Sequence, residues 1–410
     1  MEDLLVGFAS LNYKTIIMFV IGFILIYLAI KKNYEPTLLL PIGFGTILVN
    51  MPLSVVKHVS KVFDPFVTNI IKNNPDSVEF FEKMNYVYDS ATGQAYKVEP
   101  GVLEILLNGG ILTELFPVLI FVAIGAMIDF TPLFKNPVMV FFGAAAQFGI
   151  FATLLVAVAL GFDLKTASAI GIIGAADGPT AIYVAGQFAR DYFGPISVAA
   201  YSYMSLVPII QPPVIKLLTT KKERWIRMEY KEEKVSKTVK IIFPIAVTIV
   251  AGIIAPISVP LVGFLMFGNL IRECGVLERL SSSAQNELAN LVTILLGITI
   301  GSTMEADKFL QPQTLLILIM CLVAFIFDTA GGVLFAKFLN LFLKNKINPM
   351  IGAAGISAFP MSARVVHKLA LKEDPTNFIL MQSVSANVSG QLGSIIAGGL
   401  VLALVPLLVG

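Results

Sequence analysis

The sequence predicts an all-α polytopic membrane protein made of two inverted structural repeats, with broken or re-entrant helices that meet at mid-membrane. Of its 410 residues, 56% are hydrophobic and only 14% are charged, and the mean hydropathy is +0.83. Such values are typical of chains with many membrane spans. Two apolar stretches also contain glycine and proline breaks in corresponding places, at residues 174–179 and 355–360. Paired breaks of this kind are typical of transporters built from inverted repeats.

One integral membrane domain over residues 1–410 accounts for the chain, because the apolar stretches leave no room for a separate soluble domain. We divide it into a first half-repeat (residues 15–218), a basic cytoplasmic loop (219–240) and a second half-repeat (241–410). The net charge of +2 gives no indication of a nucleic-acid partner. Two histidines and two cysteines offer little material for zinc sites, histidine-based triads or disulfides.

The first span is predicted over residues 15–30, and Lys31 and Lys32 favour a cytoplasmic end after it. The N-terminus lacks a basic region and a cleavage pattern, so we expect no cleaved signal peptide. Residues 37–56 carry prolines and glycines and are either kinked or re-entrant. Residues 57–100 form the one sizeable polar insertion, an exposed loop or small cap with no assignable chemistry. Residues 102–112 are too short and too broken for a clean span.

Apolar segments with short connections make up the rest of the chain. In the first half they are residues 115–128, 137–161, 167–188 and 195–218. In the second half they are residues 241–259, 261–271, 288–300, 314–342, 349–366 and 378–409. The segments 314–342 and 378–409 are long enough to tilt strongly or to contain a break.

The loop between the halves, residues 219–240, holds eight Lys or Arg residues against four Glu residues, and it contains the only tryptophan, Trp225. The positive-inside rule places this loop in the cytoplasm, and the chain in the cytoplasmic membrane of the cell. The loop is either an orientation signal alone or also a docking surface for a cytoplasmic partner.

The stretch GIIGAADGPTAIY, residues 171–183, puts the carboxylate of Asp177 into an apolar run. Gly178 and Pro179 weaken or remove the backbone bonds of a helix, so the chain is expected to break here. Because an aspartate at the bilayer centre costs roughly 2.5 to 3.5 kcal/mol, such a residue indicates a functional site. We interpret Asp177 as an ion-binding carboxylate. The alternative is a short polar turn that dips toward one interface.

Weak internal similarity supports a duplication. IGAMIDFTPLFKNP (residues 124–137) aligns with IGSTMEADKFLQPQ (300–313), the break at 174–179 aligns with GISAFP at 355–360, and Gln211 aligns with Gln391. Since paired broken helices of transporters meet near mid-membrane, we expect GAADGPT to face GAAGISAFP, with Asp177 close to Ser357.

Other polar side chains lie in or near the breaks, and each can serve either the chemistry or ordinary helix packing. They are Tyr201, Tyr203, Ser205, Asn348, Ser357, Asn387, Ser389 and Gln391. A sodium ion prefers several oxygens and one charge, which Asp177, Ser357, Asn387 and broken-helix carbonyls can supply. Arg364 either pairs with Asp177, recognises an anionic group from the cytoplasm, or simply snorkels.

Two further polar residues are less prominent. His367 is interpreted as an interfacial residue. Asp328 ranks first among the remaining acids as a buried secondary site, although pairing or capping at a helix end explains it more simply.

These residues lie in motifs that resemble the beta subunit of the sodium-translocating, biotin-dependent decarboxylases, which act on oxaloacetate, glutaconyl-CoA or methylmalonyl-CoA. The motifs are GIIGAADGPTAIYVA, LMFGNLIRECGVLERL (residues 265–280), NPMIGAAGISAFPMSARVV (348–366) and ANVSGQLGSIIAGG (386–399). The resemblance runs from about residue 15 to the C-terminus.

The resemblance implies that a membrane subunit decarboxylates carboxybiotin, consumes a proton and exports sodium. It implies Asp177 as the sodium and proton carboxylate, Asn387 as a further sodium ligand, and Asn348, Gly352 and Ser357 as members of the second broken segment of the metal site. Tyr203 is implied in proton delivery and Arg364 in binding carboxybiotin.

The resemblance also implies partners: a biotin carrier subunit, a carboxyltransferase subunit, a small membrane subunit and further copies of the chain in a homotrimer. The chain itself carries no biotin-attachment motif, and the insertion at residues 57–100 has no role that the resemblance explains. Two other hypotheses are a free-standing sodium-coupled transporter of a small organic anion and a membrane scaffold. Biotin-dependent activity with partner subunits distinguishes them from the decarboxylase subunit.

Overall fold

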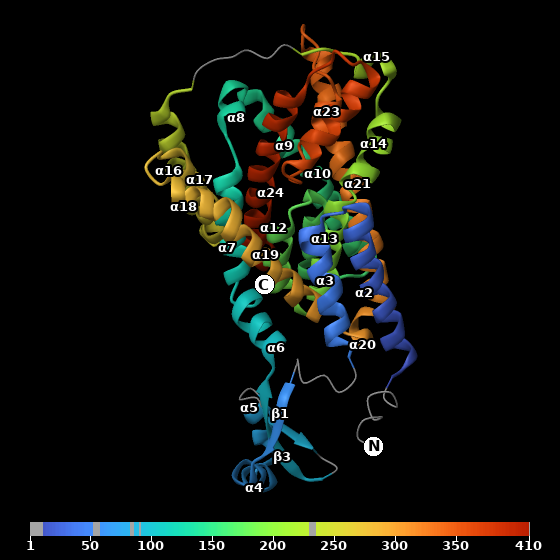
Figure 1. The fold of residues 1–410 in the computed structure, drawn as a ribbon, viewed down its shortest axis with the longest axis vertical. Coiled ribbons are helices and arrows are strands. Elements are labelled where there is room, and N and C mark those ends of the chain that lie inside the picture. Colours follow the sequence, from blue (N-terminus) through green and yellow to red (C-terminus); the bar gives the residue numbers. More distant parts are fainter. Residues whose placement is uncertain (1–10, 52–57, 83–85, 90–91, 229–234, 410) are drawn as a thin grey trace.

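The computed structural model of the chain describes residues 11–51, 58–82, 86–89, 92–228 and 235–409. Figure 1 shows an elongated helical body with a small sheet-containing domain at one end. Within the described residues, five helical stretches are long and apolar enough to cross a membrane, or up to seven if each of two bent helix pairs is one span. The prediction of a helical, multi-pass membrane chain is therefore confirmed for its apolar part.

The candidate spans include the longest helices of the chain. They are α2 (Tyr13–Lys32), a composite of η3 (Pro137–Met139), α9 (Val140–Ala146) and α10 (Phe148–Ala159), then α16 (Lys237–Ile254), α21 (Pro312–Phe342) and α24 (Leu380–Val409). The bent pairs join α6 (Val102–Leu106) and η2 (Leu107–Ile111) to α7 (Leu115–Met127), and η5 (Arg190–Tyr192) and α13 (Phe193–Ser205) to α14 (Val207–Leu218). Neither α21 nor α24 contains the break that their length allowed.

Shorter elements fill the space between these helices. They are α3 (Pro36–Val49), α8 (Thr131–Lys135), α11 (Leu164–Gly171), η4 (Ile172–Ala175), α12 (Gly178–Phe188), α15 (Lys221–Arg224), η6 (Pro256–Ser258), α17 (Val259–Glu273), α18 (Glu278–Ser283), η7 (Ala284–Leu288), α19 (Ala289–Ser302), α20 (Ala306–Phe309), α22 (Met350–Ala353) and α23 (Met361–Glu373).

The first helical hairpin follows from local sequence signals. The Asn12 side chain accepts a hydrogen bond from the Thr15 N–H at the start of α2. Lys31 and Lys32 place positive charge in its last turn, where they interact favourably with the helix dipole. Asn33 then takes the left-handed conformation, with φ 51°, and stops the helix. The following α3 has only 14 residues. At 1.5 Å per residue this gives roughly 21 Å, which is shorter than the ~30 Å hydrocarbon core.

The helices form two groups that meet around the breaks. In the α3–α19 group, α3 packs against α2 and α19, and α7 packs against α17. The α7–α17 contact depends on glycine, because a Cβ on Gly125 would lie 1.9 Å from the Leu265 carbonyl oxygen. In the α21–α24 group, α21 packs against α9, α10 and α22, and α24 packs against α9 and α23.

The two segments matched by internal similarity lead into α8 and α20. Figure 1 shows α8 at the end of the body that carries α15, and α20 at the opposite end, near the sheet-containing domain. The chain thus leaves the two matched segments at opposite ends of the helical body.

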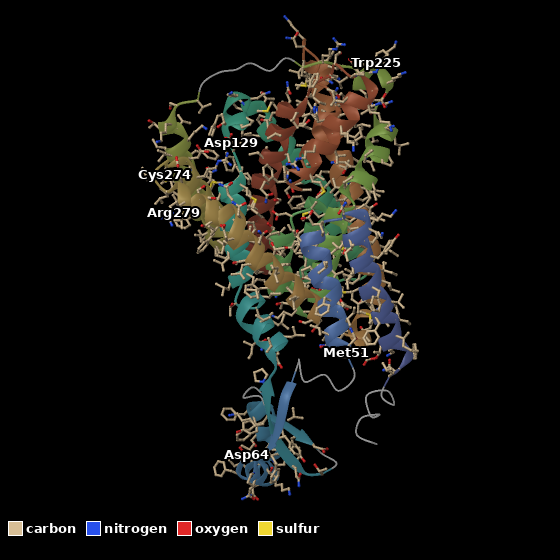
Figure 2. The ribbon with its side chains drawn as sticks, in the orientation of Figure 1. Met51, Asp64, Asp129, Trp225, Cys274 and Arg279 are labelled. Atoms are coloured by element: carbon tan, nitrogen blue, oxygen red, sulfur yellow. The ribbon has the colours of Figure 1, made fainter. Side chains whose placement is uncertain are left out.

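The polar insertion forms a small domain that the all-α prediction did not include. Its antiparallel sheet has the order β1–β3–β2, with β1 (His58–Phe63), β2 (Tyr86–Asp89) and β3 (Gln94–Pro100). Two helices and a 3-10 turn cover the sheet, α4 (Pro65–Asn73), α5 (Val78–Glu82) and η1 (Pro75–Ser77), around a core of Val67, Ile71 and Ala95. Figure 2 shows Asp64 in this domain and Trp225 at the other end of the molecule.

Asp64 ties the parts of this domain together. Its Oδ1 accepts the N–H groups of Phe66 and Val67 at 2.9 and 3.1 Å, and its Oδ2 accepts the Tyr86 hydroxyl at 3.0 Å. The backbone bond from Val67 is the largest of the effects that lower the pKa of Asp64. The ionised carboxylate therefore joins the start of α4 to β2.

Replacing Asp64 with alanine should loosen α4 and β2 without disturbing the helical body. Because the pKa of Asp64 is lowered in the folded state, its contribution is complete above about pH 4 and is lost as the pH falls through the folded-state value. Hydrogen exchange, corrected for its intrinsic pH dependence, should show this loss in native protein and not in Asp64→Ala. Asn73→Ala, at an exposed position of α4, is the control and should lose amide protection in acid as the native protein does. If Asp64→Ala and Asn73→Ala lost the same amount of protection as the pH falls, the assignment would be contradicted.

Candidate functional site

The first break forms where the sequence predicted it. The 3-10 segment η4 ends at Ala175, Ala176 takes the left-handed conformation with φ 55°, and Asp177 is extended. Asp177 is then the N-cap of α12, where Gly178 and Pro179 form the first turn. The carboxylate therefore sits between two helical pieces, where backbone groups lack helical partners.

The second break is held directly against the first. After α22 ends at Ala353, the chain is irregular until α23 begins at Met361. The backbone N–H and the hydroxyl of Ser357 both donate to the Ala175 carbonyl oxygen, at 2.9 and 2.7 Å. The prediction that GAADGPT faces GAAGISAFP is confirmed by these two bonds.

Asn387 of α24 fastens the second break from the other side. Its Nδ2 donates to the carbonyl oxygens of Ala354 and Ile356, at 3.2 and 2.6 Å. Its Oδ1 is buried and accepts no hydrogen bond from the described residues. A buried amide oxygen without such a partner can coordinate a cation or accept a hydrogen bond from a water molecule.

Asp177 is almost completely buried, with 3% of its surface exposed. Its Oδ2 accepts the hydroxyls of Thr180 and Ser394, at 2.7 and 2.6 Å, and the Gln391 amide at 3.0 Å. From the described residues its Oδ1 accepts only the long bond of the Thr180 N–H, at 3.4 Å. Among the described residues no Lys, Arg or His forms an ion pair with Asp177. A buried carboxylate with only neutral partners is costly unless it takes up a cation or a proton.

The sequence does not predict the contacts of Gln391 and Ser394 with Asp177. They lie three residues apart on α24, so they share a helix face, and both turn their polar groups to the same oxygen. The sequence indicates Gln391 only as a polar residue near a break and as a repeat match, and Ser394 only as part of the motif ANVSGQLGSIIAGG.

A cavity of about 230 Å³ opens beside Asp177. The breaks contribute Asp177, Gly178, Ser357 and Phe359 to its wall, and α13 contributes Tyr201. A Cβ on Gly178 would lie 2.5 Å from the Tyr201 ring, so glycine allows the tyrosine to cover the break. The described residues contain no cluster of three or more His, Cys, Asp or Glu side chains that could hold a metal ion. The side-chain donors at Asp177 are carboxylate, hydroxyl and amide oxygens, which are ligands of hard cations.

Tyr203, implied in proton delivery, lies elsewhere. Its hydroxyl donates to the Leu318 carbonyl oxygen of α21 at 2.7 Å, and it is not part of the cavity wall. Tyr201, two residues earlier, is buried in that wall.

Arg364 does not pair with Asp177. It lies exposed on α23, and in the described part of the chain it forms no ion pair. This corrects the alternative in which the guanidinium neutralises the buried carboxylate, because Thr180, Gln391 and Ser394 surround that carboxylate instead.

Asn348 and Gly352 stabilise the surroundings of the second break. Asn348 Nδ2 donates to the carbonyl oxygens of Arg224 and Ile226, at 3.0 and 2.8 Å. A Cβ on Gly352 would lie 1.9 Å from the Gly332 carbonyl oxygen, so Gly352 permits close packing of α22 on α21. Neither residue lines the cavity at Asp177.

The described start of the basic loop folds onto the end of α23. Trp225 Nε1 donates to the Glu373 carbonyl oxygen at 3.1 Å, and Arg227 pairs with Asp374 at 2.9 Å. Lys231 and Lys234 of this loop lie outside the described residues. This part of the loop is therefore engaged within the chain itself.

Asp328 is a second fully buried carboxylate. It belongs to α21 and packs against the start of α10, where a Cβ on Gly149 would be 2.1 Å from its Oδ1, and against the first break, where a Cβ on Gly174 would be 3.0 Å from its Oδ2. Neither of its carboxylate oxygens has a hydrogen-bond partner among the described residues, so the capping interpretation stays a prediction.

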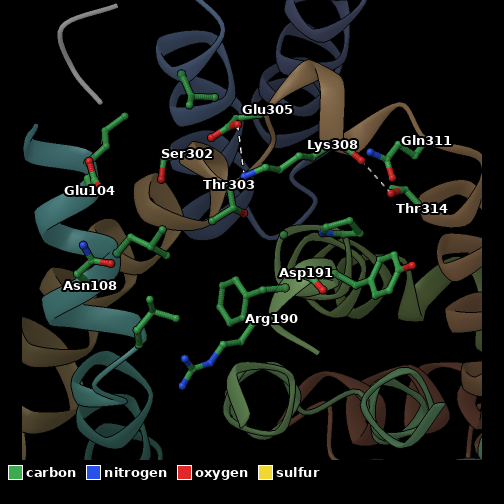
Figure 3. Close-up of a pocket in the computed structure, with 18 residues that line it drawn as sticks. Glu104, Asn108, Arg190, Asp191, Ser302, Thr303, Glu305, Lys308, Gln311 and Thr314 are labelled. Atoms are coloured by element: carbon green, nitrogen blue, oxygen red, sulfur yellow. Dashed lines mark hydrogen bonds and ion pairs between the residues drawn. The ribbon is translucent and has the colours of Figure 1, made fainter. Parts of the chain in front are cut away.

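A larger cavity of about 630 Å³ lies at the end that carries α20 (Figure 3). Charged residues line it, among them Glu104, Arg190, Asp191 and Lys308, and Lys308 pairs with Glu305 at 3.6 Å. It shares no lining residue with the cavity at Asp177.

Comparison with known proteins gives a consistent result. The family model described as "Na+-transporting oxaloacetate decarboxylase beta subunit" matches residues 14–405. The chain is 47% identical to oxaloacetate decarboxylase beta chain 2 of Salmonella typhi, over 97% of this chain and 96% of the relative. It is 47% identical to methylmalonyl-CoA decarboxylase subunit beta of Propionigenium modestum (97% and 96% covered) and 46% identical to glutaconyl-CoA decarboxylase subunit beta of Acidaminococcus fermentans (97% and 95% covered).

Proposed function

Because the chain belongs to the family of Na+-transporting oxaloacetate decarboxylase beta subunits, we propose that it decarboxylates carboxybiotin and couples this reaction to sodium export. The bond between the ureido nitrogen and the carboxyl carbon breaks, carbon dioxide leaves, and the nitrogen takes up a proton. The chain is the membrane subunit of a sodium-pumping decarboxylase, and the named relatives offer nothing in favour of a free-standing transporter.

The observation that carries the proposal is the buried carboxylate of Asp177, whose partners among the described residues are neutral, at the contact between two helix breaks. Moving one positive charge against the membrane potential costs about 2.3 kcal/mol per 100 mV, so export needs an energy-releasing step. If sodium and a proton compete for one carboxylate, the proton consumed by decarboxylation can displace the ion. Asp177 is placed for that exchange.

The sodium site that we propose uses oxygens from both breaks. Asp177 Oδ1, the Ser357 hydroxyl and Asn387 Oδ1 are its side-chain ligands, because Asp177 Oδ1 accepts only one long bond and Asn387 Oδ1 accepts none from the described residues. Broken-helix carbonyls supply further oxygens in transporters of this type.

Replacing Asn387 with alanine should weaken sodium binding about tenfold, since a lost hydrogen bond or ligand of this kind is worth about 1 to 2 kcal/mol. Asn269→Ala is a matched control, because the Asn269 amide also donates to two carbonyls, of Gly125 and Ile128, but lies between α17 and α7. Half-saturating sodium for turnover is the measurement. Equal shifts in the two variants would remove Asn387 from the site.

The remaining predicted residues have separate roles in the proposal. Arg364 is exposed on α23, and we assign its guanidinium to the carboxylate of carboxybiotin, to which it can bond in a bidentate manner. Asn348 holds the basic loop and Gly352 lets α22 pack on α21, so both support the second broken segment of the proposed metal site. Tyr203 holds α13 against α21, and Tyr201 is the tyrosine of α13 that lines the cavity at Asp177.

The architecture and the partners extend the proposal. Two inverted repeats are supported by the matched segments that lead into α8 and α20 at opposite ends of the body (Figure 1). The α21–α24 group would move along the α3–α19 group in an elevator-like exchange of access. Partners would be a biotin carrier subunit, a carboxyltransferase subunit and a small membrane subunit, with the chain itself a homotrimer in the cytoplasmic membrane.

The test is reconstitution of the complex in proteoliposomes with carboxybiotin delivered by its carrier. Sodium transport that starts with carboxybiotin and stops when the carrier is withheld supports the proposal. Sodium-driven uptake of an organic anion without any carrier would replace it with the transporter hypothesis.

A further inference from the structure

The cavity at Asp177 has a second wall, built by the α3–α19 group. The turn between α2 and α3 contributes Glu35 and Thr37, and α19 contributes Asn290 and Thr293. Apolar side chains of α7 complete this wall. Glu35 is thus a carboxylate that lines the same cavity as Asp177, on the opposite group of helices.

Glu35 is held in an unusual backbone conformation. It has φ 36° and ψ 62°, in the left-handed region, and it directly precedes Pro36. Such a conformation costs about 1 to 3 kcal/mol for a residue other than glycine, and residues that pay it cluster at functional sites. A glycine would adopt this turn more easily.

The Glu35 side chain is free for a ligand. Its backbone carbonyl accepts the N–H groups of Leu38 and Leu39 at the start of α3, whereas its carboxylate makes no capping bond. Among the residues that the structure places, the carboxylate accepts a hydrogen bond only from the Thr37 hydroxyl, at 3.3 Å. In the part of the chain that the structure describes, no Lys or Arg pairs with it.

We propose that Glu35 is the charged group of a transient sodium site at the entrance of the cavity, from which the ion passes to Asp177. This inference rests on the proposed function. The turn follows Lys31 and Lys32, and Figure 1 shows it at the end of α2 that faces α15, away from the sheet-containing domain. The entrance therefore lies on the side that the basic residues place in the cytoplasm.

The chemistry fits a weakly held monovalent cation. One carboxylate with the neutral oxygens of Thr37, Asn290 and Thr293 provides a single negative charge. A charge in a cavity with apolar walls raises the local cation concentration and speeds ion entry. Because Glu35 and Asp177 belong to different helix groups, a movement of one group along the other would separate the entrance from the deeper site.

The experiment compares Glu35→Gln, Glu35→Asp and Glu35→Gly with the native chain in the assembled complex. The control is Glu278→Gln, the same charge change at an exposed position of α18 outside the cavity. Half-saturating sodium is measured for decarboxylation and for the sodium-dependent rise in melting temperature of the purified chain. We expect Glu35→Gln and Glu35→Gly to raise the half-saturating sodium concentration about fivefold, which is the effect of losing an interaction worth about 1 kcal/mol.

The glycine variant separates a ligand role from a turn role. If Glu35 only shapes the turn, Glu35→Gly relieves the left-handed strain and leaves the sodium dependence native, which overturns the proposal. Native sodium dependence in Glu35→Gln overturns it as well. The half-saturating sodium of Glu35→Asp should lie closer to the native value, because this variant keeps the carboxylate. Glu35→Asp therefore still tests the proposal if a neutral variant does not fold. Failure of the proposed function itself is distinct, since sodium dependence would then survive in Asp177→Asn.

Discussion

Replacing Asp177 with asparagine should lower sodium-stimulated turnover at least about 100-fold, because a group that acts in the exchange itself contributes several kcal/mol to catalysis. Asparagine has almost the same shape and can still accept the Ser394 hydroxyl, so the breaks should keep their contact. What the variant loses is the negative charge that both sodium and the proton require. The measurement is decarboxylation of carboxybiotin by the complex as sodium is varied.

Asp163→Asn is the matched control for this variant. Asp163 is also an N-cap, of α11, and accepts the Thr166 N–H at 3.0 Å, but it does not line the cavity. The complex with Asp163→Asn should decarboxylate carboxybiotin at nearly the native rate. If Asp177→Asn remained sodium-stimulated, or if both variants lost turnover equally, Asp177 would not be the exchanging carboxylate.

Gly352→Ala should abolish turnover by a different route, through packing. The added Cβ would lie 1.9 Å from the Gly332 carbonyl oxygen, so α22 and α21 must move apart. Overpacking of this kind usually costs about 1 to 3 kcal/mol, and here it also displaces the second break that Ser357 and Asn387 hold. The melting temperature of the purified chain and its half-saturating sodium should both change.

Gly109→Ala provides the comparison, because nothing lies within 4 Å of the Cβ that it would add. This variant should melt and turn over like the native chain. A Gly352→Ala chain of native melting temperature that still lost sodium binding would instead indicate a ligand role for the backbone of Gly352.

The parts of the fold that sequence could predict are those set by local chemistry. The span at residues 15–30 lies within α2, and Gly178 and Pro179 mark the first break because they remove helical backbone bonds. The facing of the two breaks followed from their matching order in the two halves, and the Ser357 bonds to Ala175 confirm it. The span and the first break need only a short window of sequence, whereas the facing of the breaks required a comparison of the two halves.

The features that sequence could not predict depend on distant neighbours. Strand formation in residues 58–100 depends on cross-strand partners such as Phe63 opposite Tyr96, which a polar segment does not reveal. Tyr201 and Tyr203 lie two residues apart on α13 and so point in different directions, and only the packing of the helix shows that Tyr201 lines the cavity. The same holds for Ser394, whose role appears only once α24 lies beside Asp177.

The most direct test of the account is calorimetric sodium binding by the purified chain at two pH values, with buffers that report proton release. If sodium and a proton compete for Asp177, sodium affinity should fall as the pH is lowered and binding should release up to about one proton. The Asp177→Asn chain should bind no sodium at this site. Sodium binding that is independent of pH, or that persists in Asp177→Asn, would contradict the central claim.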